Sequence, residues 1–414
     1  MLSSRSSPLF ALAVCTSFAL RVNCADRRHD LHRLAIATFN ARFLFDGVAP
    51  EGEASFPWKQ DPSAARRHVR EIAAILRPLD ADLVHISEVE DLDTLKRLAL
   101  EIGDSTYRSY LISGRDQFTR QNVGLLTRID PDLPLTRTDE WSASPRGGER
   151  QGVPKNYAAR VTVGSLRLTF IGAHLLAFPE DPERWPRREG QAEALRRFAV
   201  EEGTRLGRLV IILGDLNDLD PDWPDASGRR TQSDVLRILR EVDRSGPDDD
   251  LWNPMSTLRQ EQRFTSFVDR SNNGRDDGLD ERSLTDHILL SQALATAVTN
   301  VEVFSGYDPI TGPSDHFPLK VTLDLAQLRL FIRGDVNGDL RIDTEDAVQI
   351  LHGLFAGDAL DCQDAADAND DGRVDLSDAV RVLQQTNRGD AGLPPPGPRL
   401  PGGDPSEDVL GCPS

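Results

Sequence analysis

The sequence predicts an α/β protein with two packed β-sheets covered by helices, followed by a small helical segment built around two acidic loops. Two observations predict the first part: about ten apolar segments typical of strands, and a few longer segments with helical periodicity between them. The third observation is an acidic pattern that occurs twice after residue 334. The chain is therefore expected to contain a large domain and a smaller one.

Strand and helix signals alternate along the large domain. Residues 34–45 are typical of a strand, residues 61–78 repeat apolar side chains at helical spacing and stop at Pro78, and residues 82–87 are again typical of a strand. Helices are also predicted near 91–102 and 187–202. Further strands are predicted at 107–112, 122–127, a pair within 157–173, 209–214, 263–267, 286–291, 301–304 and 317–323.

The N-terminal residues differ from the rest of the chain. Arg5 is followed by an apolar run from Pro8 to Leu20 and by small or polar residues up to Ala25, a run too short for a membrane span. We expect a secretory signal peptide over residues 1–25; a disordered or weakly anchoring terminus is the alternative. A secreted protein, extracellular, periplasmic or associated with the cell surface, follows from this reading. Oxidising conditions could then join Cys362 to Cys412.

The formal net charge is −19, and neither the large domain nor the tail has an excess of basic residues. This composition excludes binding of nucleic acid through a broad positive field. A polyanionic substrate would have to be met by a metal ion and a few placed cations.

Polar side chains gather where the predicted strands end, which is where α/β folds assemble sites. They are Asn40, Glu88, His174, Asp215 with Asn217, Asp286, and Asp315 with His316. Glu88 and Asp315, helped by Asn40, offer the oxygen ligands that Mg²⁺ prefers. Hydrolysis of a phosphodiester also needs a general base, and His316 oriented by Asp286 is the candidate.

Six motifs carry a family resemblance: TFNARFLFD, HISEVED, IGAHLL, GDLND, LTDHILLS and PSDHFPL. In this order, over roughly residues 33–325, they resemble the endonuclease/exonuclease/phosphatase superfamily. The resemblance implies a four-layer α/β/β/α sandwich and metal-dependent hydrolysis of phosphate esters. It implies that Glu88 binds Mg²⁺ or Mn²⁺, with Asn40 and Asp315 near the same ion.

The resemblance also implies roles for the remaining site residues. Asp215 and Asn217 would orient the water and stabilise the transition state, His316 held by Asp286 would activate the water, and His174 would contact the phosphate or assist the leaving oxygen. Two arginines, Arg115 and Arg160, are candidate phosphate contacts, although each is equally typical of a salt-bridged arginine. Asp116 is a candidate carboxylate partner for His174.

Some residues receive structural interpretations instead. His287 should point to the face opposite Asp286, and Asp218 and Asp220 are expected to be solvated loop acids. Glu90 stands where deoxyribonucleases of the family have an arginine, which argues against their minor-groove contact.

The segments 113–127 and 88–99 are similar to bacterial extracellular nucleases, so a secreted nuclease is the first hypothesis, with DNA and RNA both open. The alternatives are a sphingomyelinase-like or small-molecule phosphoesterase and a non-catalytic extracellular adhesion or scaffold protein.

After the large domain (26–333), residues 334–388 contain DVNGDLRIDTED and DANDDGRVDLSD, which match calcium loops with oxygens at positions 1, 3, 5, 7, 9 and 12. Each loop precedes a short predicted helix, 347–355 or 379–385, and the pair resembles a type I dockerin, which implies Ca²⁺ and a cohesin-like or cell-surface partner. An acidic disordered tail is the alternative. Residues 389–414 are rich in Pro and Gly and are expected to be extended unless Cys412 holds them. The expected ligands are Asp335, Asn337, Asp339, Arg341 (carbonyl), Asp343, Asp346, Asp367, Asn369, Asp371, Arg373 (carbonyl), Asp375 and Asp378.

Overall fold

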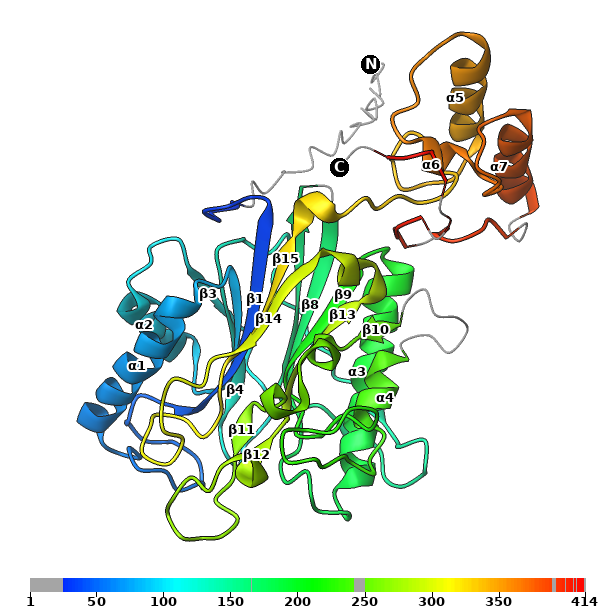
Figure 1. Ribbon diagram of the computed structural model, residues 1–414. Helices are drawn as coiled ribbons and strands as arrows, with labels where there is room; N and C mark the ends of the chain where they lie inside the picture. Colours follow the sequence, from blue (N-terminus) through cyan, green and yellow to red (C-terminus); the bar gives the residue numbers. More distant parts are fainter. Residues whose placement is uncertain are drawn as a thin grey trace, which may run out of the picture.

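The computed structural model describes residues 25–164, 166–241, 250–388, 392–398, 400–404, 406 and 408–412. The predicted signal peptide, apart from Ala25, lies outside the described residues. Within the described residues, two β-sheets lie face to face with helices outside them, and a helical C-terminal segment extends from one end (Figure 1). No helix in these ranges is long and apolar enough to cross a membrane.

The first sheet has the strand order β14-β15-β1-β2-β4-β3. Its central strands β1 and β2 are parallel, and the other pairs are antiparallel. Helices α1 (Pro62–Leu76) and α2 (Leu92–Ile102) pack their apolar faces on its outer side, and the Asp61 carboxylate caps α1. The strands are β1 (Arg33–Leu44), β2 (Leu83–Val89), β3 (Arg108–Leu111), β4 (Asn122–Thr127), β14 (Val298–Val303) and β15 (Leu319–Asp324).

The second sheet has the order β10-β13-β9-β8-β7, in which β8 and β9 are parallel. Helices α3 (Trp185–Val200) and α4 (Val235–Arg240) cover its outer face. The strands are β7 (Asn156–Val163), β8 (Leu166–His174), β9 (Leu209–Asp215), β10 (Leu251–Trp252) and β13 (Asp286–Ser291). Two small ribbons pair β5 (Trp141–Ser142) with β6 (Gln151–Gly152) and β11 (Ser266–Phe267) with β12 (Arg282–Ser283).

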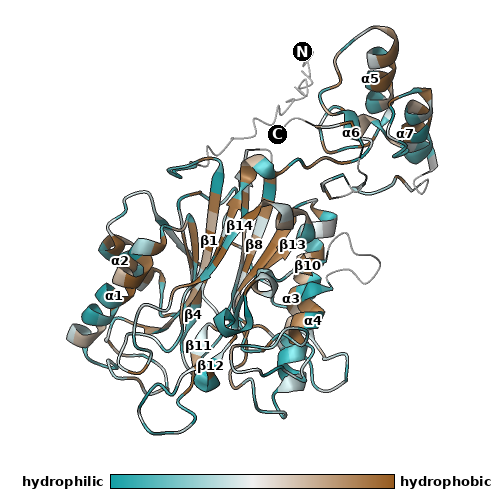
Figure 2. Cartoon of the chain, in the orientation of Figure 1, coloured by the Kyte–Doolittle hydropathy of each residue, from teal (hydrophilic) through white to brown (hydrophobic). Residues whose placement is uncertain are grey.

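The main hydrophobic core lies between the two sheets. Leu34, Ile36 and Leu83 of the first sheet and Phe170 and Ile211 of the second are all fully or nearly fully buried in it. Figure 2 shows the strands as largely hydrophobic and the loops as largely hydrophilic. The layers are thus helix, sheet, sheet and helix, and the α/β prediction is confirmed.

The longer predicted elements are present with small shifts at their ends. Four two-residue strands, α4 and the four-residue helix α6 (Gln363–Ala366) were not predicted, and the strand predicted at 263–267 is reduced to Ser266–Phe267. Such short elements contain too few residues to show a period. Short 3₁₀-helices occur at Arg77–Leu79, Pro254–Thr257, Gln260–Gln262, Leu279–Glu281, Gln292–Ala297 and Leu325–Gln327, and a π-helix occurs at Glu201–Arg205.

The C-terminal segment contains α5 (Thr344–Phe355), α6 (Gln363–Ala366) and α7 (Leu376–Arg388). Helices α5 and α7 follow the two acidic loops as predicted and bury Ala347, Ile350, Ala379 and Val382 between them. Their packing gives this segment its own small core.

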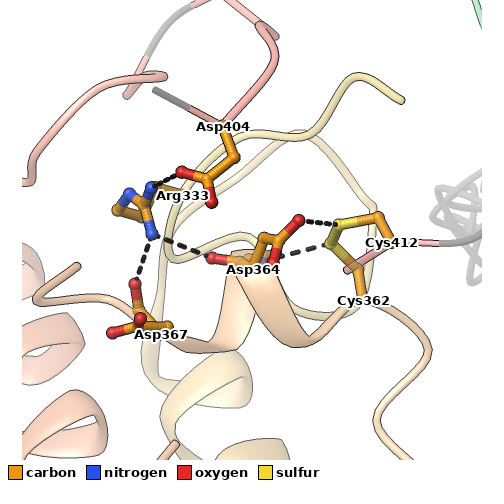
Figure 3. Close-up of a disulfide and its surroundings, with 7 residues drawn as sticks. Arg333, Cys362, Asp364, Asp367, Asp404 and Cys412 are labelled. Atoms are coloured by element: carbon orange, nitrogen blue, oxygen red, sulfur yellow. Dashed lines mark hydrogen bonds and ion pairs between the residues drawn. A yellow bond between two sulfur atoms is a disulfide. The ribbon is translucent and has the colours of Figure 1, made fainter. Parts of the chain in front are cut away.

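The Pro/Gly-rich tail is held against this segment. Cys362 and Cys412 form the disulfide that the sequence allows (Figure 3). Arg333, only 1% exposed, donates to the carbonyls of Asp364 and Asp367 and pairs with Asp404 at 2.8 Å. The Arg333 Nε also donates to the carbonyl of Pro395. Arg333, the last residue of the predicted large domain, therefore packs with the C-terminal segment.

Candidate active site

The candidate catalytic residues meet at one end of the two sheets. In the first sheet, β1 carries Asn40 and β2 carries Glu88, and these strands run in parallel with Asn40 opposite Ser87. In the second sheet, β8 ends at His174 and β9 ends at Asp215, and these two residues are partners in register. Asp286 opens the antiparallel strand β13 directly opposite Asp215. Strand direction and register therefore bring distant residues together.

Asn40 joins the two sheets by hydrogen bonds. Its Nδ2 donates to Glu88 Oε1 at 3.1 Å and to Asp215 Oδ2 at 2.9 Å, while its Oδ1 accepts from the Arg42 backbone N–H at 3.0 Å. The amide thus orients two carboxylates, and its oxygen is occupied by the backbone of its own strand. Glu88 Oε2 accepts a second hydrogen bond, from the Phe43 N–H at 3.0 Å.

His316 and Asp286 form a close pair. Asp286 Oδ2 lies 2.7 Å from His316 Nδ1, and His316 Nε2 points toward Asp215 Oδ2 at 3.9 Å. Burial alone would lower the pKa of His316, but Asp286 and Asp215 together hold the pKa well above its ordinary value. Burial and the charge of Asp286 raise the pKa of Asp215 to about 7. His316 Nε2, the ring nitrogen that Asp286 does not contact, therefore faces a second carboxylate, that of Asp215.

His174 lies on the other side of Asp215. Its Nε2 is 3.6 Å from Asp215 Oδ2, and its Nδ1 has no hydrogen-bond partner among the described residues. Burial, with the charges of Lys155 and His316, lowers the pKa of His174 well below its ordinary value, so this imidazole is neutral. The suggested partner Asp116 is wrong, because its carboxylate faces Lys155 at 3.5 Å and accepts from Thr119.

The backbone is unusual at two of the site residues. Glu88 has φ 65° at an irregularity in the pairing of β2 with β4, and Asn217 has φ 50° just after β9. Non-glycine residues in this left-handed region cluster at functional sites, where the surrounding contacts hold them. The Asn217 amide donates to the Leu175 carbonyl at 3.2 Å, which ties the end of β9 to the residue after His174.

The oxygen atoms at this end of the sheets fit a hard divalent cation. Burial disfavours the charged form of Glu88 and so raises its pKa. A bound cation would offset this cost of keeping the carboxylate ionised. Asp315 is 41% exposed beside it, with Oδ1 4.0 Å from Arg42 Nε. Asp215, Asp286 and His316 present ligand atoms that all lie within 4.8 Å of one another. This close group does not include Glu88 or Asp315, and the bridge from Asn40 Nδ2 links Glu88 to Asp215.

The two candidate arginines have different surroundings. Arg115 lines a cleft that also contains Glu88 and His174, and it pairs with Asp139 at 2.8 Å. Arg160 forms an ion pair with the fully buried Glu202. It stands opposite Thr169, five positions before the end of β8, and is therefore remote from the cluster.

Two of the structural interpretations are wrong and one is confirmed. Asp218 and Asp220 are fully buried rather than solvated. Asp218 pairs with the fully buried Arg188 at 2.9 Å, and Asp220 accepts from Asn253. A buried partner far along the chain cannot be read from the local run of acids. His287 points to the opposite face, where its ring contacts the Asp218 carbonyl at 2.9 Å.

Sequence reasoning missed Lys155. Its largely buried ammonium lies 3.3 Å from Gln121 Oε1. Burial raises the pKa of Glu88 and the charge of Lys155 opposes that rise, whereas burial and the charge of Lys155 together lower the pKa of His174. A single lysine before a strand is not part of any recognisable motif. Only the pairing of β7 with β8 shows that Lys155 lies near the cluster.

The model of the Endonuclease/Exonuclease/phosphatase family matches residues 37–316, which include every residue of this cluster. The chain belongs to this family. Family members hydrolyse phosphoric esters with the help of divalent metals, and the chain is assigned the coarser part of this activity, hydrolysis of phosphoric esters. No curated protein matches the chain.

Three solved structures illustrate the similarity, each at low sequence identity to the chain. One is a 3′-5′ exonuclease from Neisseria meningitidis (21% identity, 70% of this chain and 100% of that chain, TM-score 0.46). An AP endonuclease from Archaeoglobus fulgidus has 17% identity over 70% of this chain and 99% of that chain, with a TM-score of 0.45. TDP2 from Caenorhabditis elegans has 16% identity over 70% and 74%, with a TM-score of 0.44.

Proposed function

We propose that this protein is a secreted, Mg²⁺- or Mn²⁺-dependent nuclease that hydrolyses phosphodiester bonds by attack of an activated water. The observation that carries the proposal is the hydrogen-bonded cluster in which Asn40 links Glu88 to Asp215 while Asp286 holds His316. A base, its orienting carboxylate and a set of oxygen ligands thus lie within one small site.

Glu88 and Asp315 would hold the cation, with the Asn40 amide fixing the orientation of Glu88. A bound divalent ion supplies charge stabilisation to a phosphoryl group and lowers the pKa of water. The buried Lys155 adds a fixed positive charge on the same side of the site.

His316 would accept a proton from the attacking water at Nε2, because its Nδ1 is engaged by Asp286. This role needs the neutral ring, which a cation bound at the carboxylates would favour by offsetting the negative charge that holds the pKa of His316 high. Asp215 faces that nitrogen and would orient the water, and Asn217 would fix the loop after β9 through its bond to the Leu175 carbonyl. The neutral His174 can donate a hydrogen bond to a phosphate oxygen or to the leaving oxygen.

Nucleic acid is favoured over a small phosphoester by the size and lining of the cleft beside the cluster. The cleft has a volume of ≈ 910 Å³ and is lined by Arg115, Arg137, Lys155, Arg184 and Arg187. These are the few placed cations that an acidic protein needs to hold a polyanion.

The test is a substrate panel of single- and double-stranded DNA, RNA, sphingomyelin and inositol phosphates, each with Mg²⁺ and with chelator. We expect metal-dependent cleavage of nucleic acid that is abolished in His316→Ala. Hydrolysis confined to sphingomyelin or inositol phosphates would refute the nuclease assignment while leaving the family activity intact.

We further propose that the C-terminal loops bind Ca²⁺ as a dockerin-like module. The two loops repeat the same hydrogen bonds: Asp335 accepts from the N–H groups of Asp339 and Leu340, and Asp367 accepts from those of Asp371 and Gly372. Position 6 adopts the left-handed conformation in both, with φ 68° at Leu340 and φ 78° at Gly372. This geometry supports two equivalent sites, which calorimetric titration with Ca²⁺ would count.

Secretion and a protein partner complete the proposal. The disulfide supports an oxidising compartment, and N-terminal sequencing of the protein from culture medium tests cleavage near Ala25. A cohesin-like or cell-surface partner of the calcium module is tested by calcium-dependent binding to candidate cohesins, and no binding would leave the module without this role.

A further inference from the structure

We propose that the cleft beside the catalytic cluster binds unpaired nucleobases, by stacking them on the exposed rings of Phe118 and Phe178. Trp141 would provide a third ring further along the same cleft. The proposal rests on the nuclease function above and names its substrate form: a single strand, or a duplex end whose bases have come apart.

The three rings are unusual in their exposure and in their position. Phe118 is 67% exposed, Phe178 is 64% exposed and Trp141 is 52% exposed, and all three line the cleft into which Glu88 and His174 also open. Large apolar side chains lose favourable burial energy when they stay in water, so several around one catalytic cleft indicate a ligand.

Phe118 is presented on an anchored backbone. Its N–H donates to the Asp116 carboxylate at 3.0 Å, and its carbonyl accepts from the Glu53 N–H at 2.8 Å. Gly52 allows this close approach, because a Cβ there would lie 2.7 Å from the Phe118 carbonyl oxygen. The ring is exposed although the loop that carries it is held from two sides.

Phe178 is also held in place, and at a conformational cost. Its φ of 66° lies in the left-handed region that bulky residues rarely adopt. Its carbonyl accepts from the buried Arg188 at 3.3 Å, and the Arg184 guanidinium stacks on its ring at 4.4 Å. A strained residue whose ring is exposed beside an active site is typical of a binding contact.

Trp141 packs against Gly152 of β6, where a Cβ would come within 3.0 Å of the indole. The glycine therefore leaves room for the ring, which stays 52% exposed. Three rings from three separate loops or ribbons thus surround the same opening.

The charge of the cleft fits a phosphate backbone. Five basic side chains and three acidic ones line it, in a chain whose net charge is −19. Alternation of aromatic rings with basic side chains is the pattern by which proteins bind single strands, since every base has a π-face and every link has a phosphate. Paired bases inside a duplex expose only their edges to a groove and cannot stack on such rings.

The test measures binding by the full-length chain in a His316→Ala background, so that cleavage does not interfere. Fluorescence anisotropy with labelled oligothymidylate would be compared with an abasic strand of the same length and with a hairpin duplex. We expect the base-bearing strand to bind more tightly than the other two, and Phe118→Ala and Phe178→Ala each to weaken its binding by about 5- to 100-fold. Binding of the abasic strand should not change.

Two variants serve as controls. Phe178→Tyr keeps a stacking ring and should retain affinity, and Phe355→Ala removes a 76% exposed ring on α5, outside the cleft, and should have no effect. Equal binding of base-bearing and abasic strands, or unchanged binding in both cleft variants, would overturn the proposal. So would loss of binding to sphingomyelin-containing vesicles in these variants while oligonucleotide binding stayed intact.

Failure of the proposed function would look different. In that case the active chain would cleave no nucleic acid with Mg²⁺, whatever the outcome of the base-dependent binding measurement.

Discussion

The catalytic cluster and the C-terminal loops both crowd carboxylates, but they hold them by different means. In the cluster, Glu88 and Asp215 come from different sheets and are bonded by the side chain of Asn40. In the first loop, Asp346 accepts from the backbone N–H groups of Val336, Asn337 and Asp343, all within ten residues. The cluster is therefore built by the packed sheets, and the loop by its own backbone.

This difference has an energetic consequence. In the cluster, the positive charge of Lys155 and the protonated ring of His316 offset part of the negative charge before any metal binds. In the loops, burial and neighbouring carboxylates raise the pKa values of Asp335 and Asp378 to about 6. Burial also raises the pKa of Asp367, and the nearby cation Arg333 only opposes this rise. We therefore expect the cluster to keep its shape without metal and the loops to depend on Ca²⁺ for folding.

The largest expected effect comes from removing the general base His316 or the carboxylate of Asp286 that holds it. His316→Ala and Asp286→Ala should each lower kcat by roughly 10²- to 10⁴-fold, and the double variant should lose little more than either single one. Steady-state kinetics on a nucleic-acid substrate measures this, with calcium-dependent circular dichroism as the control for the loops. Losses that multiply in the double variant would show that the two residues do not act together.

The next effect concerns the C-terminal segment alone. Arg333→Ala should destabilise it by about 3–5 kcal/mol, because Asp404 and Asp370 would lose a buried partner. Arg373→Ala is the matched control, since Arg373 is exposed and is expected to offer only its carbonyl. Thermal unfolding with Ca²⁺ reports stability, and kcat should stay unchanged. A parallel fall in kcat would contradict the independence of the two regions.

A third prediction concerns Glu88, the carboxylate proposed to bind the metal ion of the cluster. Glu88→Gln should raise the Mg²⁺ concentration needed for half-maximal activity at least as much as the loss of an outer-shell partner does, about 10- to 100-fold. Glu71→Gln, an exposed change on α1, is the control. Wild-type activity of Glu88→Gln at low Mg²⁺ would remove Glu88 from the metal site.

A smaller effect compares the two loops directly. Leu340 and Gly372 share a left-handed backbone, which only glycine adopts without strain. Leu340→Gly should therefore stabilise the calcium-bound segment by about 1 kcal/mol, and Gly372→Leu should destabilise it by at least as much. Calorimetric titration of the two variants with Ca²⁺ measures both effects. If Leu340→Gly weakened the calcium-bound segment, or if neither substitution changed it, backbone strain at position 6 would not be the cause.

The smallest effect is expected when the whole C-terminal segment is removed. A chain ending at Leu330 should keep kcat within about twofold, because the cluster and its supports all precede it, and additivity of distant sites is the rule. An end at Ala326 is less suitable, because it removes Leu328, which is buried in the core between the sheets. Activity assays on the two shortened chains would show whether Leu328 matters.

Much of the fold follows from local patterns in the sequence. The apolar runs of β1, β4 and β9 and the helical period of α1 predict the sandwich, because a strand or helix face that must be buried shows its period over a few residues. The positions of Asn40, Glu88 and Asp215 at strand ends also predicted that they would meet. The residue type of Arg160 suits a phosphate contact, but its register opposite Thr169 places it in the middle of β7, away from the strand ends where the cluster lies.

The sequence by itself determined which residues are apolar, where strands end and how each acidic loop closes on its own backbone, since all of these depend on neighbours within a few residues. Only the tertiary structure decided that Asp218 is neutralised by Arg188, that Lys155 faces Glu88 and that Phe118 and Phe178 share one cleft. These contacts join loops far apart in the chain. Their partners are chosen by how the two sheets bury their common core, and no local period records that choice.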